Sequence, residues 1–290
     1  MLPTEQFGTV AAAAALATVM MTSGNAVAGP KVEAIYEHGE PTFTLATGSP
    51  GELGLLEALA AGFAERRPAT LRWVKAGSGA SLKLLEEKEV DLVMVHAPEA
   101  EKQAVSDGWA VGRTLIGSNE FYIVGPADDP ARTREAGSAA AAYRRIALAE
   151  APFITRADSS GTHKKEMAIW ELVGLKPEGD WYIASHDFMT ASLMKANELG
   201  GYFMTDSSTW VAEKPNAPNL AVLLEGDPFL VNTYHALLPP DATTPGREVA
   251  ARFVEFVAGA KGQEIIRTYG ANRFGGPLYQ DAEYAKQYVH

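Results

Sequence analysis

The chain has 290 residues, of which 47% are hydrophobic and 21% charged, with a formal net charge of −11 and no cysteine. This composition indicates a soluble globular protein, long enough for two domains, and its acidic balance argues against nucleic-acid binding. The lack of cysteine excludes disulfides, thiolate metal sites, cysteine nucleophiles and a lipidated N-terminal cysteine.

Residues 1–28 are predicted to be a signal peptide. The run Val10 to Met21 is apolar but too short to span a bilayer, and Ala26-Val27-Ala28 forms a small-x-small cleavage site before Gly29. The first eight residues contain Glu5 and no Lys or Arg, which is unusual for a signal, so an alanine-rich cytosolic helix is the alternative. We expect a periplasmic, freely diffusing protein that begins at Gly29.

After a loose lead-in over 29–41, strands are predicted to alternate with helices. Each strand ends in a short loop, rich in small residues, that opens the next helix. This alternation predicts parallel βαβ units, in which ligands bind at the carboxyl ends of the strands. The predicted strands are 42–46, 70–74 and 90–95, and the helices are 53–66, 82–88 and 99–107.

The middle of the chain indicates a second lobe. The apolar run Glu120 to Val124 is predicted to leave the first lobe, and Leu220 to Leu224 is predicted to be the return strand. Between them we expect helices at 136–149, after Arg156 up to Val173, at 190–199 and at 207–212, with a strand at 201–205. Helices 247–258 and 262–269 should pack back on the first lobe. The prediction is an α/β clamshell with two hinge crossings, in which 29–122 plus 226–290 form lobe 1 and 123–225 form lobe 2.

The segment from Arg156 to Glu166 is the strongest candidate for a binding site. It follows an apolar strand and opens a helix, so its first turn offers backbone N–H groups that attract anions. Three hydroxyls and the guanidinium fork of Arg156 add further donors. The alternative is an N-capped helix in which Ser and Thr only satisfy the first turn.

From about Phe43 to Ala282, the sequence resembles the tungstate-binding components of ABC importers, within the wider class of type II periplasmic solute-binding proteins for molybdate and phosphate. The resemblance is carried by Ala46-Thr-Gly-Ser49, Gly77-Ser-Gly79 with Leu82-Lys83, Val90 to Pro98, Arg156 to Glu166, Ala196-Asn-Glu198, Thr205-Asp206, Gly226-Asp-Pro228 and Asn232. It implies a ligand site made of Thr47, Gly48, Ser49, Ser78, Gly79, Arg156, Ser159, Ser160, Gly161 and Thr162.

Four residues in three segments depart from the family pattern. Ala46-Thr47-Gly48-Ser49 replaces the usual Thr-Thr-Thr-Ser, Leu53 replaces a Ser, and Ser159 replaces a second Asp. Hydroxyl donors are thereby lost from the first lobe and a carboxylate from the second. Affinity or ligand identity can therefore differ from that of the family.

The choice of anion depends on Asp158. A fully ionised tetrahedral dianion needs only donors, whereas hydrogenphosphate also needs an acceptor for its proton. We expect Asp158 to cap the following helix or to pair with Arg156, which favours tungstate. Molybdate, phosphate or another small anion is the alternative, as is a receptor that serves a signalling partner.

No catalytic arrangement is predicted. Ser160, His163 and Asp158 lie too close together in sequence for a triad, and no Gly-x-Ser-x-Gly elbow is present. His96 with Glu99 lacks a third metal ligand, as does His186 with Asp187, and both pairs are interpreted as caps or surface groups. A hydrolase or transferase acting on a phosphorylated metabolite would need a base or a metal in the cleft. We therefore expect no metal, cofactor or enzymatic activity, and a monomer whose partners are a small oxyanion and a membrane permease.

Overall fold

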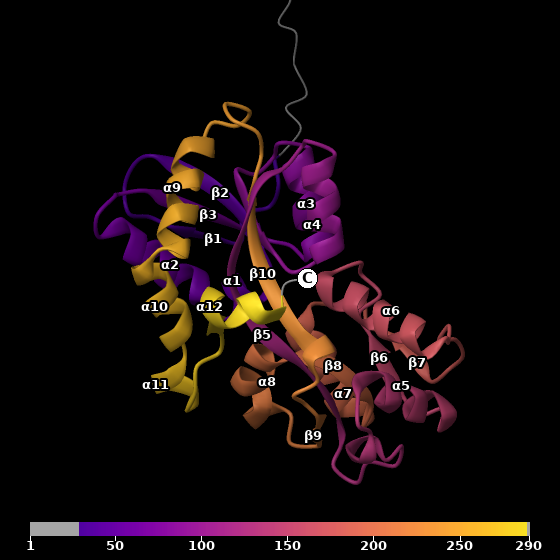
Figure 1. Ribbon diagram of the computed structural model, residues 1–290. Helices are drawn as coiled ribbons and strands as arrows, with labels where there is room; N and C mark the ends of the chain where they lie inside the picture. Colours follow the sequence, from indigo (N-terminus) through magenta and orange to yellow (C-terminus); the bar gives the residue numbers. More distant parts are fainter. Residues whose placement is uncertain (1–28, 289–290) are drawn as a thin grey trace, which may run out of the picture.

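The longest strand, β5 (Val111–Pro126), runs through both lobes of the molecule. The computed structural model describes residues 29–288, so the predicted signal peptide lies outside the described residues. Up to Glu120, β5 pairs with β10 (Val231–Leu238), and from Phe121 onward it pairs with β8 (Tyr202–Asp206). Figure 1 shows β5 and β10 side by side in the middle of the molecule, between the two groups of elements. These two strands are the crossings of a two-lobed clamshell.

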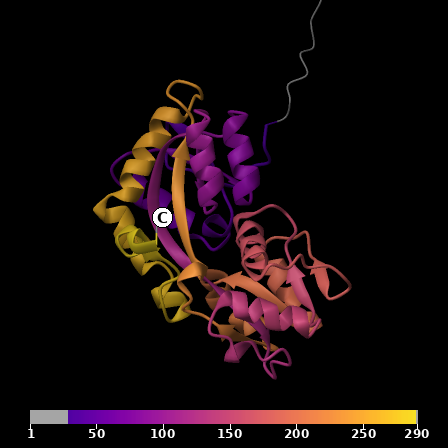
Figure 2. The same cartoon turned by 45° about the vertical axis from the view of Figure 1, so that its right-hand side comes forward.

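The first lobe is built on the strand order β1-β3-β2-β4-β10-β5. Strand β2 is parallel to β3 and β4, whereas β10 is antiparallel to both of its neighbours. In Figure 2 the magenta helices α3 and α4 and the orange helix α9 lie on opposite sides of the orange strand β10. The other elements of this lobe are β1 (Ala34–Tyr36), β2 (Thr42–Thr47), α1 (Ser49–Glu52), α2 (Leu55–Ala64), β3 (Thr70–Lys75), α3 (Ser78–Glu86), β4 (Leu92–Val95), α4 (Pro98–Ser106), α9 (Arg247–Ala258), α10 (Ala260–Thr268), α11 (Ala271–Phe274), β11 (Gln280–Asp281), α12 (Ala282–Ala285) and the 3-10 turn η4 (Lys286–Tyr288).

The second lobe continues the sheet in the order β5-β8-β6-β7, with β9 paired to β5 as well. Strand β6 is parallel to both β7 and β8. The remaining elements are the 3-10 turn η1 (Thr133–Glu135), α5 (Ala139–Leu148), β6 (Phe153–Thr155), α6 (Gly161–Val173), β7 (Tyr182–Ala184), α7 (Met189–Leu199), α8 (Ser207–Glu213), η2 (Lys214–Asn216), β9 (Leu220–Leu224) and η3 (Pro228–Leu230).

Each lobe has its own hydrophobic core. One cluster of buried residues lies wholly between Phe121 and Leu230, around the fully buried Trp170. Two further clusters cover the two faces of the first-lobe sheet and draw on the chain before Ala131 and after Leu230. Because the cores are separate, the lobes can move relative to each other without breaking either core.

The hinge differs from the sequence prediction. Strand β9 is not the return crossing, because it pairs with Ile123 to Pro126 inside the second lobe, and β10 makes the return. The pattern of β10 includes buried Asn232, Thr233 and His235, and the first half of β5 includes Ser118 and Asn119. Hydropathy does not mark such strands, because polar side chains lie among their buried residues. The lead-in was also mispredicted, because 34–36 forms strand β1 against β3.

A buried ionic network ties helix α4 to both hinge strands. Glu101 is fully buried and accepts hydrogen bonds from the Ala97 N–H at 2.7 Å and from Arg113 Nε at 2.9 Å. His235 on β10 lies 3.0 Å from the same carboxylate through Nδ1. A buried carboxylate with three partners is held firmly, and removal of one member leaves the others uncompensated.

We therefore expect Glu101→Ala to lower the free energy of unfolding by about 3–5 kcal/mol, since it leaves Arg113 and His235 without their carboxylate. Urea denaturation followed by circular dichroism measures this. Glu99 is the matched control, because it lies on the same helix with its side chain 89% exposed. Glu99→Ala should change the free energy of unfolding by less than about 0.5 kcal/mol. Equal effects of the two substitutions would contradict the network.

Candidate ligand-binding site

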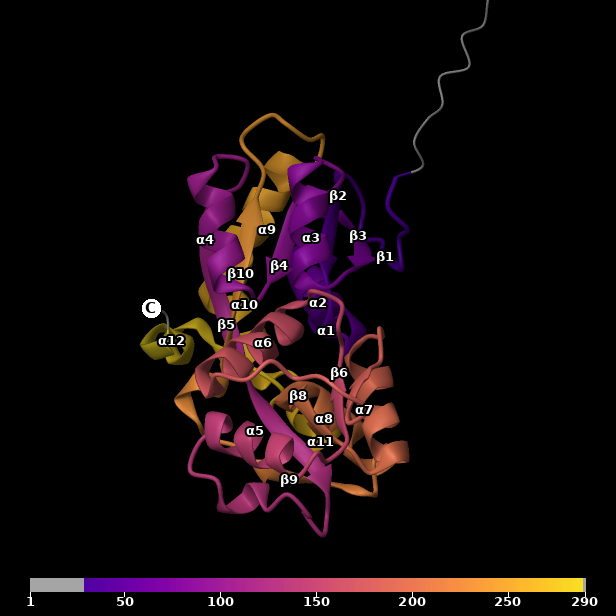
Figure 3. The same cartoon turned by 90° about the vertical axis from the view of Figure 1, so that its right-hand side faces the viewer.

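The carboxyl ends of the parallel strands of both lobes meet at the boundary between the lobes. In the first lobe, β2, β3 and β4 are followed by Gly48, Gly77 and His96, and in the second lobe β6 is followed by Arg156 and β8 ends at Asp206. Figure 3 shows α3 and α6 on either side of this boundary. The structure thus brings the predicted loops together, as the parallel-sheet rule requires.

Arg156 is buried beneath the loop that follows β6, with 4% of its surface exposed. Its Nε donates to the Asp187 carbonyl at 3.1 Å, and Nη2 donates to Asp158 Oδ2 at 2.5 Å. The other Asp158 oxygen accepts from the Ser160 N–H at 3.0 Å. Burial raises the pKa of Asp158, but Arg156 and the Ser160 bonds outweigh it, so its pKa lies below the ordinary value. Asp158 therefore pairs with Arg156, as expected from the sequence.

The first turn of α6 combines a satisfied cap with an unsatisfied hydroxyl. Ser160 is the N-cap, and its Oγ accepts from the His163 N–H at 3.3 Å. Ser159, just before the cap, is exposed and has a positive φ of 58°. Thr162 is 1% exposed, and within residues 29–288 its Oγ1 has no hydrogen-bond partner. The helix-cap alternative thus accounts for Ser160 and leaves Thr162 unexplained, because a buried hydroxyl without a partner costs about 1–3 kcal/mol.

Both hydroxyls at the end of β2 and the start of α1 make hydrogen bonds to other protein groups. Thr47 is buried, and its Oγ1 donates to the Met94 carbonyl at 2.8 Å. Gly48 precedes α1, and Ser49 Oγ lies 3.5 Å from Asp206 Oδ2 in the second lobe. The Thr47 hydroxyl is therefore engaged inside the first lobe, whereas the Ser49 hydroxyl reaches across the boundary.

The start of α3 faces the start of α6. Ser78 is 3% exposed, and its Oγ accepts from the His96 N–H at 3.1 Å. Among the described residues its own O–H donates to no protein acceptor. Two backbone N-termini with small residues therefore oppose each other, which is the arrangement that favours a bound anion.

Two glycines let the lobes touch. A Cβ at Gly79 would lie 2.7 Å from the Ser159 carbonyl oxygen, and one at Gly161 would lie 2.5 Å from ring atoms of His96. Real Cβ atoms do not approach other atoms so closely, so only glycine fits at either position while the lobes are in contact. The described conformation is therefore the closed one.

A cation also bridges the lobes. The Nζ atom of Lys75, which ends β3, lies 4.5 Å from the centroid of the Phe188 ring in the second lobe. The Arg156 guanidinium carbon lies 5.5 Å from the same ring. Lys75 also forms an ion pair with Glu52 at 2.9 Å. Cation–π contacts of this kind add stability to the closed state.

His96 is not the cap or surface group predicted from the sequence. Its ring packs against Gly161, and its Nδ1 lies 2.9 Å from Asn232 Oδ1. Burial and the charge of Arg156 lower the pKa of His96 to about 4, so the ring is neutral at physiological pH. The sequence carried one signal for this position, since His96 directly follows the strongly apolar strand β4.

Asp206 is a second functional candidate that the ligand-residue prediction missed. It is 1% exposed and caps α8, with its Oδ1 accepting from the Thr209 N–H at 2.8 Å. The same carboxylate accepts from Asn119, Ser208 and the Thr209 hydroxyl. Its position after a buried strand and before Ser-Ser-Thr indicates a cap, but the contact with Ser49 across the boundary is a tertiary feature.

The side chains of Ser160 and His163 each bond to a backbone N–H group near the start of α6. The Ser160 hydroxyl contacts the backbone N–H of His163, while the His163 ring accepts from the Ser159 N–H at 3.0 Å. Ser160 and His163 are therefore not paired as nucleophile and base. Within residues 29–288 no three His, Cys, Asp or Glu side chains are grouped to hold a metal ion.

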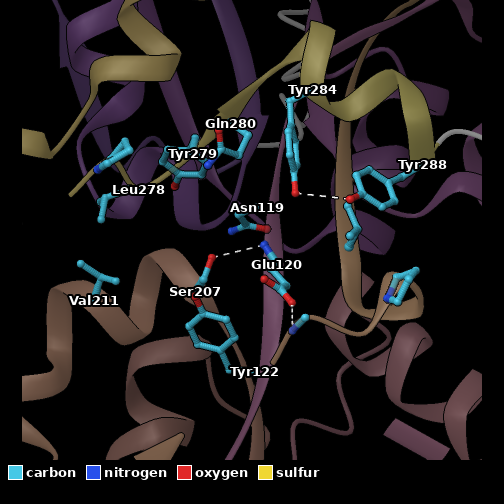
Figure 4. Close-up of a pocket in the computed structure, with 14 residues that line it drawn as sticks. Asn119, Glu120, Tyr122, Ser207, Val211, Leu278, Tyr279, Gln280, Tyr284 and Tyr288 are labelled. Atoms are coloured by element: carbon cyan, nitrogen blue, oxygen red, sulfur yellow. Dashed lines mark hydrogen bonds between the residues drawn. The ribbon is translucent and has the colours of Figure 1, made fainter. Parts of the chain in front are cut away.

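A separate hollow of about 220 Å³ lies at the hinge. Figure 4 shows Asn119 and Glu120 of β5 at its centre, with Tyr284 and Tyr288 on the side of the C-terminal segment. Glu120 accepts from the Gly226 N–H, and Ser207 Oγ accepts from the Glu120 N–H at 3.2 Å. None of the predicted ligand residues lines this hollow. The predicted site and the hinge hollow are distinct regions.

We expect Gly161→Ala to prevent full closure, because its methyl group would collide with the backbone and ring of His96. Small-angle scattering should give a larger radius of gyration than for the wild type. Gly137→Ala is the matched control, since a Cβ at Gly137 meets nothing within 4 Å. If Gly161→Ala and the wild type are equally compact in solution, the described lobe contact does not form there.

Comparisons with known proteins agree with this fold. The model of the PBP superfamily domain matches residues 17–261. A tungstate-binding protein TupA of Peptoclostridium acidaminophilum is 33% identical over 237 residues, which cover 80% of this chain and 82% of that protein. A putative ABC transporter anion-binding protein of Haloferax volcanii is 36% identical over 239 residues, covering 79% and 69%.

A solved structure shows the same similarity. The crystal structure of the tungstate ABC transporter from Geobacter sulfurreducens superimposes with a TM-score of 0.71 at 33% identity, and the match covers 80% of this chain and all of that one. The chain therefore belongs to the PBP superfamily, in the family of ABC-transporter anion-binding proteins that includes the TupA tungstate-binding proteins.

Proposed function

We propose that this protein captures a small tetrahedral oxyanion, in the first place tungstate, between its lobes and delivers it to the permease of an ABC importer. The ligand residues would be Thr47, Gly48, Ser49, Ser78, Gly79, Arg156, Ser159, Ser160, Gly161 and Thr162. The ligand binds and is released unchanged, so no enzymatic step is proposed. Lobe 1 would comprise 29–120 plus 231–288, and lobe 2 would comprise 121–230, a small shift from the boundaries predicted from the sequence.

The observation that carries this proposal is the Thr162 hydroxyl. It is buried at the start of α6 without a hydrogen-bond partner among the described residues. The Ser78 hydroxyl likewise donates to no protein acceptor among the described residues, while its Oγ accepts a hydrogen bond from the His96 N–H. Two oriented hydroxyls beside two helix N-termini and a buried guanidinium match the needs of an anion that only accepts hydrogen bonds.

The carboxylates at the boundary favour a fully ionised anion. Both Asp158 oxygens already accept hydrogen bonds, from Arg156 and from Ser160. Asp206 accepts from five donors, including the hydroxyl of Ser49. With five donors on about four acceptor sites, Asp206 has no capacity left for the proton of hydrogenphosphate, whose O–H would then be buried unpaired. Asp158 keeps two of its about four acceptor sites, and its charge is offset by Arg156. Tungstate and molybdate carry no such proton at neutral pH, and the relatives' names favour tungstate.

We also propose that the protein is exported to the periplasm and carries no lipid anchor. The relatives are binding proteins of ABC transporters. None of the helices described between residues 29 and 288 has the length and hydropathy needed to cross a membrane. We infer that the chain acts as a monomer, with the permease as its protein partner and no role for nucleic acid.

We expect Thr162→Val to separate ligand binding from stability. Valine has nearly the same shape but no hydroxyl, so the ligand-free protein should unfold at the same or a higher urea concentration. Tungstate affinity, measured by calorimetric titration, should fall by about 1.5–3 kcal/mol, the range for a hydrogen bond to a charged group.

Thr209→Val is the control for Thr162→Val. Its hydroxyl donates to Asp206 Oδ2 at 2.9 Å, so its loss should destabilise the free protein. Unchanged tungstate affinity in Thr162→Val would place its hydroxyl outside the site.

Arg156→Ala should weaken tungstate binding by at least about 1.5 kcal/mol, because it removes a donor and leaves Asp158 as an unpaired negative charge beside the ligand. Arg132→Ala is the matched control, since Arg132 is exposed and pairs only with Glu135 among acidic residues described. Titration of the wild type with tungstate, molybdate, sulfate and phosphate tests the choice of ligand. Phosphate binding as tight as tungstate binding would overturn the argument from the saturated Asp206 carboxylate.

A further inference from the structure

Four buried or partly buried polar side chains form a continuous hydrogen-bonded chain through the hinge. Asn119 Nδ2 lies 3.3 Å from Asp206 Oδ1, and Asn232 Nδ2 lies 2.8 Å from Asn119 Oδ1. Asn232 Oδ1 in turn lies 2.9 Å from His96 Nδ1. Asn119, Asn232 and Asp206 are each at most 4% exposed, so water competes little for these groups.

We call this chain of Asp206, Asn119, Asn232 and His96 the relay. The carboxylate of Asp206, at one end, determines which group donates and which accepts in each of its hydrogen bonds. Asp206 Oδ1 already accepts from the Thr209 N–H and so acts as an acceptor, which means that Asn119 presents its NH₂ group to it and its oxygen to Asn232. Asn232 must then donate to Asn119 and present its own oxygen to His96. The only arrangement left is donation from a protonated Nδ1 of His96.

We propose that Asp206, Asn119 and Asn232 are positioning residues that hold His96 as the neutral Nδ1–H tautomer at the contact between the lobes. The minor tautomer of free histidine is thereby made the fixed form. The relay also fixes where His96 lies, because its ring is anchored through Nδ1 while its backbone N–H donates to Ser78 Oγ.

The relay spans all the parts that must move together on closure. Asn119 and Asn232 lie directly opposite each other on the two hinge strands. His96 belongs to the first lobe and packs on Gly161 of the second, whereas Asp206 belongs to the second lobe and contacts Ser49 of the first. A rotation of the lobes about the hinge must therefore lengthen or bend the hydrogen bond to His96 at one end of the relay or the hydrogen bond to Asp206 at the other. We infer that the intact relay favours the closed conformation, and this step deepens the proposed anion-binding function.

The tautomer is measured directly on the ligand-free protein. In a two-bond ¹H–¹⁵N correlation spectrum of ¹⁵N-histidine-labelled protein, the His96 ring should show a protonated Nδ1 and an unprotonated Nε2. The exposed His186 serves as the internal control and should show the ordinary mixture of tautomers. A His96 ring protonated at Nε2 in the wild type overturns the proposal. Asn232→Ala removes the oxygen that accepts from His96 Nδ1, so the His96 ring in this variant should show a mixture of the two tautomers. An unchanged Nδ1–H signal in Asn232→Ala also overturns the proposal.

The link to closure is tested with a matched pair of substitutions at His96. An asparagine amide can place its donor near the position of Nδ1, whereas the longer glutamine places its amide toward the position of Nε2. His96→Asn should therefore keep tungstate affinity within roughly threefold of the wild type, and His96→Gln should lose about tenfold or more together with compaction in solution scattering. Equal affinities of the two variants overturn the link to closure. A wild type that binds no tungstate refutes the proposed function, whereas the relay is judged by the tautomer spectrum alone.

Discussion

The ladder between β5 and β10 is the constraint on which the rest of the structure depends. These two strands carry the chain out of one lobe and back into it, and they contribute buried residues to the separate hydrophobic clusters of both lobes. The lobes share no cluster of buried hydrophobic residues. We therefore expect the lobes to move relative to each other by bending of β5 and β10. The buried polar residues of the pair, Asn119 and Asn232, bond to each other and also to Asp206 and His96, which lie at the boundary between the lobes.

The electrostatics of the site follow from this closure. The protein is acidic overall, with a formal charge of −11, so its net field does not attract an anion. The donors that could hold one are local: the two opposed helix starts, the Ser78 and Thr162 hydroxyls, and Arg156. Of the carboxylates nearby, Asp158 is paired with Arg156, and Asp206 accepts from five donors, which leaves Asp206 no capacity for a further hydrogen bond.

The lobe contact also explains why glycine occurs where it does. Gly79 and Gly161 face Ser159 and His96 across the boundary with no room for a Cβ. A site that closes this tightly excludes water and strengthens each hydrogen bond to an anion. The same closeness requires that its polar atoms be placed accurately, which is the role inferred for the relay that ends at His96.

The sequence alone determined the class of fold, the alternation of strands and helices, and the opening of α6 with its cap, because these depend on local hydropathy and capping residues. The helix predicted to run up to Val173 ends at that residue, and Asp158 pairs with Arg156, one of the two roles that the sequence predicts for it. The ligand residues remain a prediction. Only the tertiary structure decided that β10 is the return crossing, that the Thr47 hydroxyl is engaged at Met94, and that His96 and Asp206 belong to the boundary. Those features depend on buried polar groups whose partners are distant in sequence, and neither hydropathy nor spacing encodes which partner each will find.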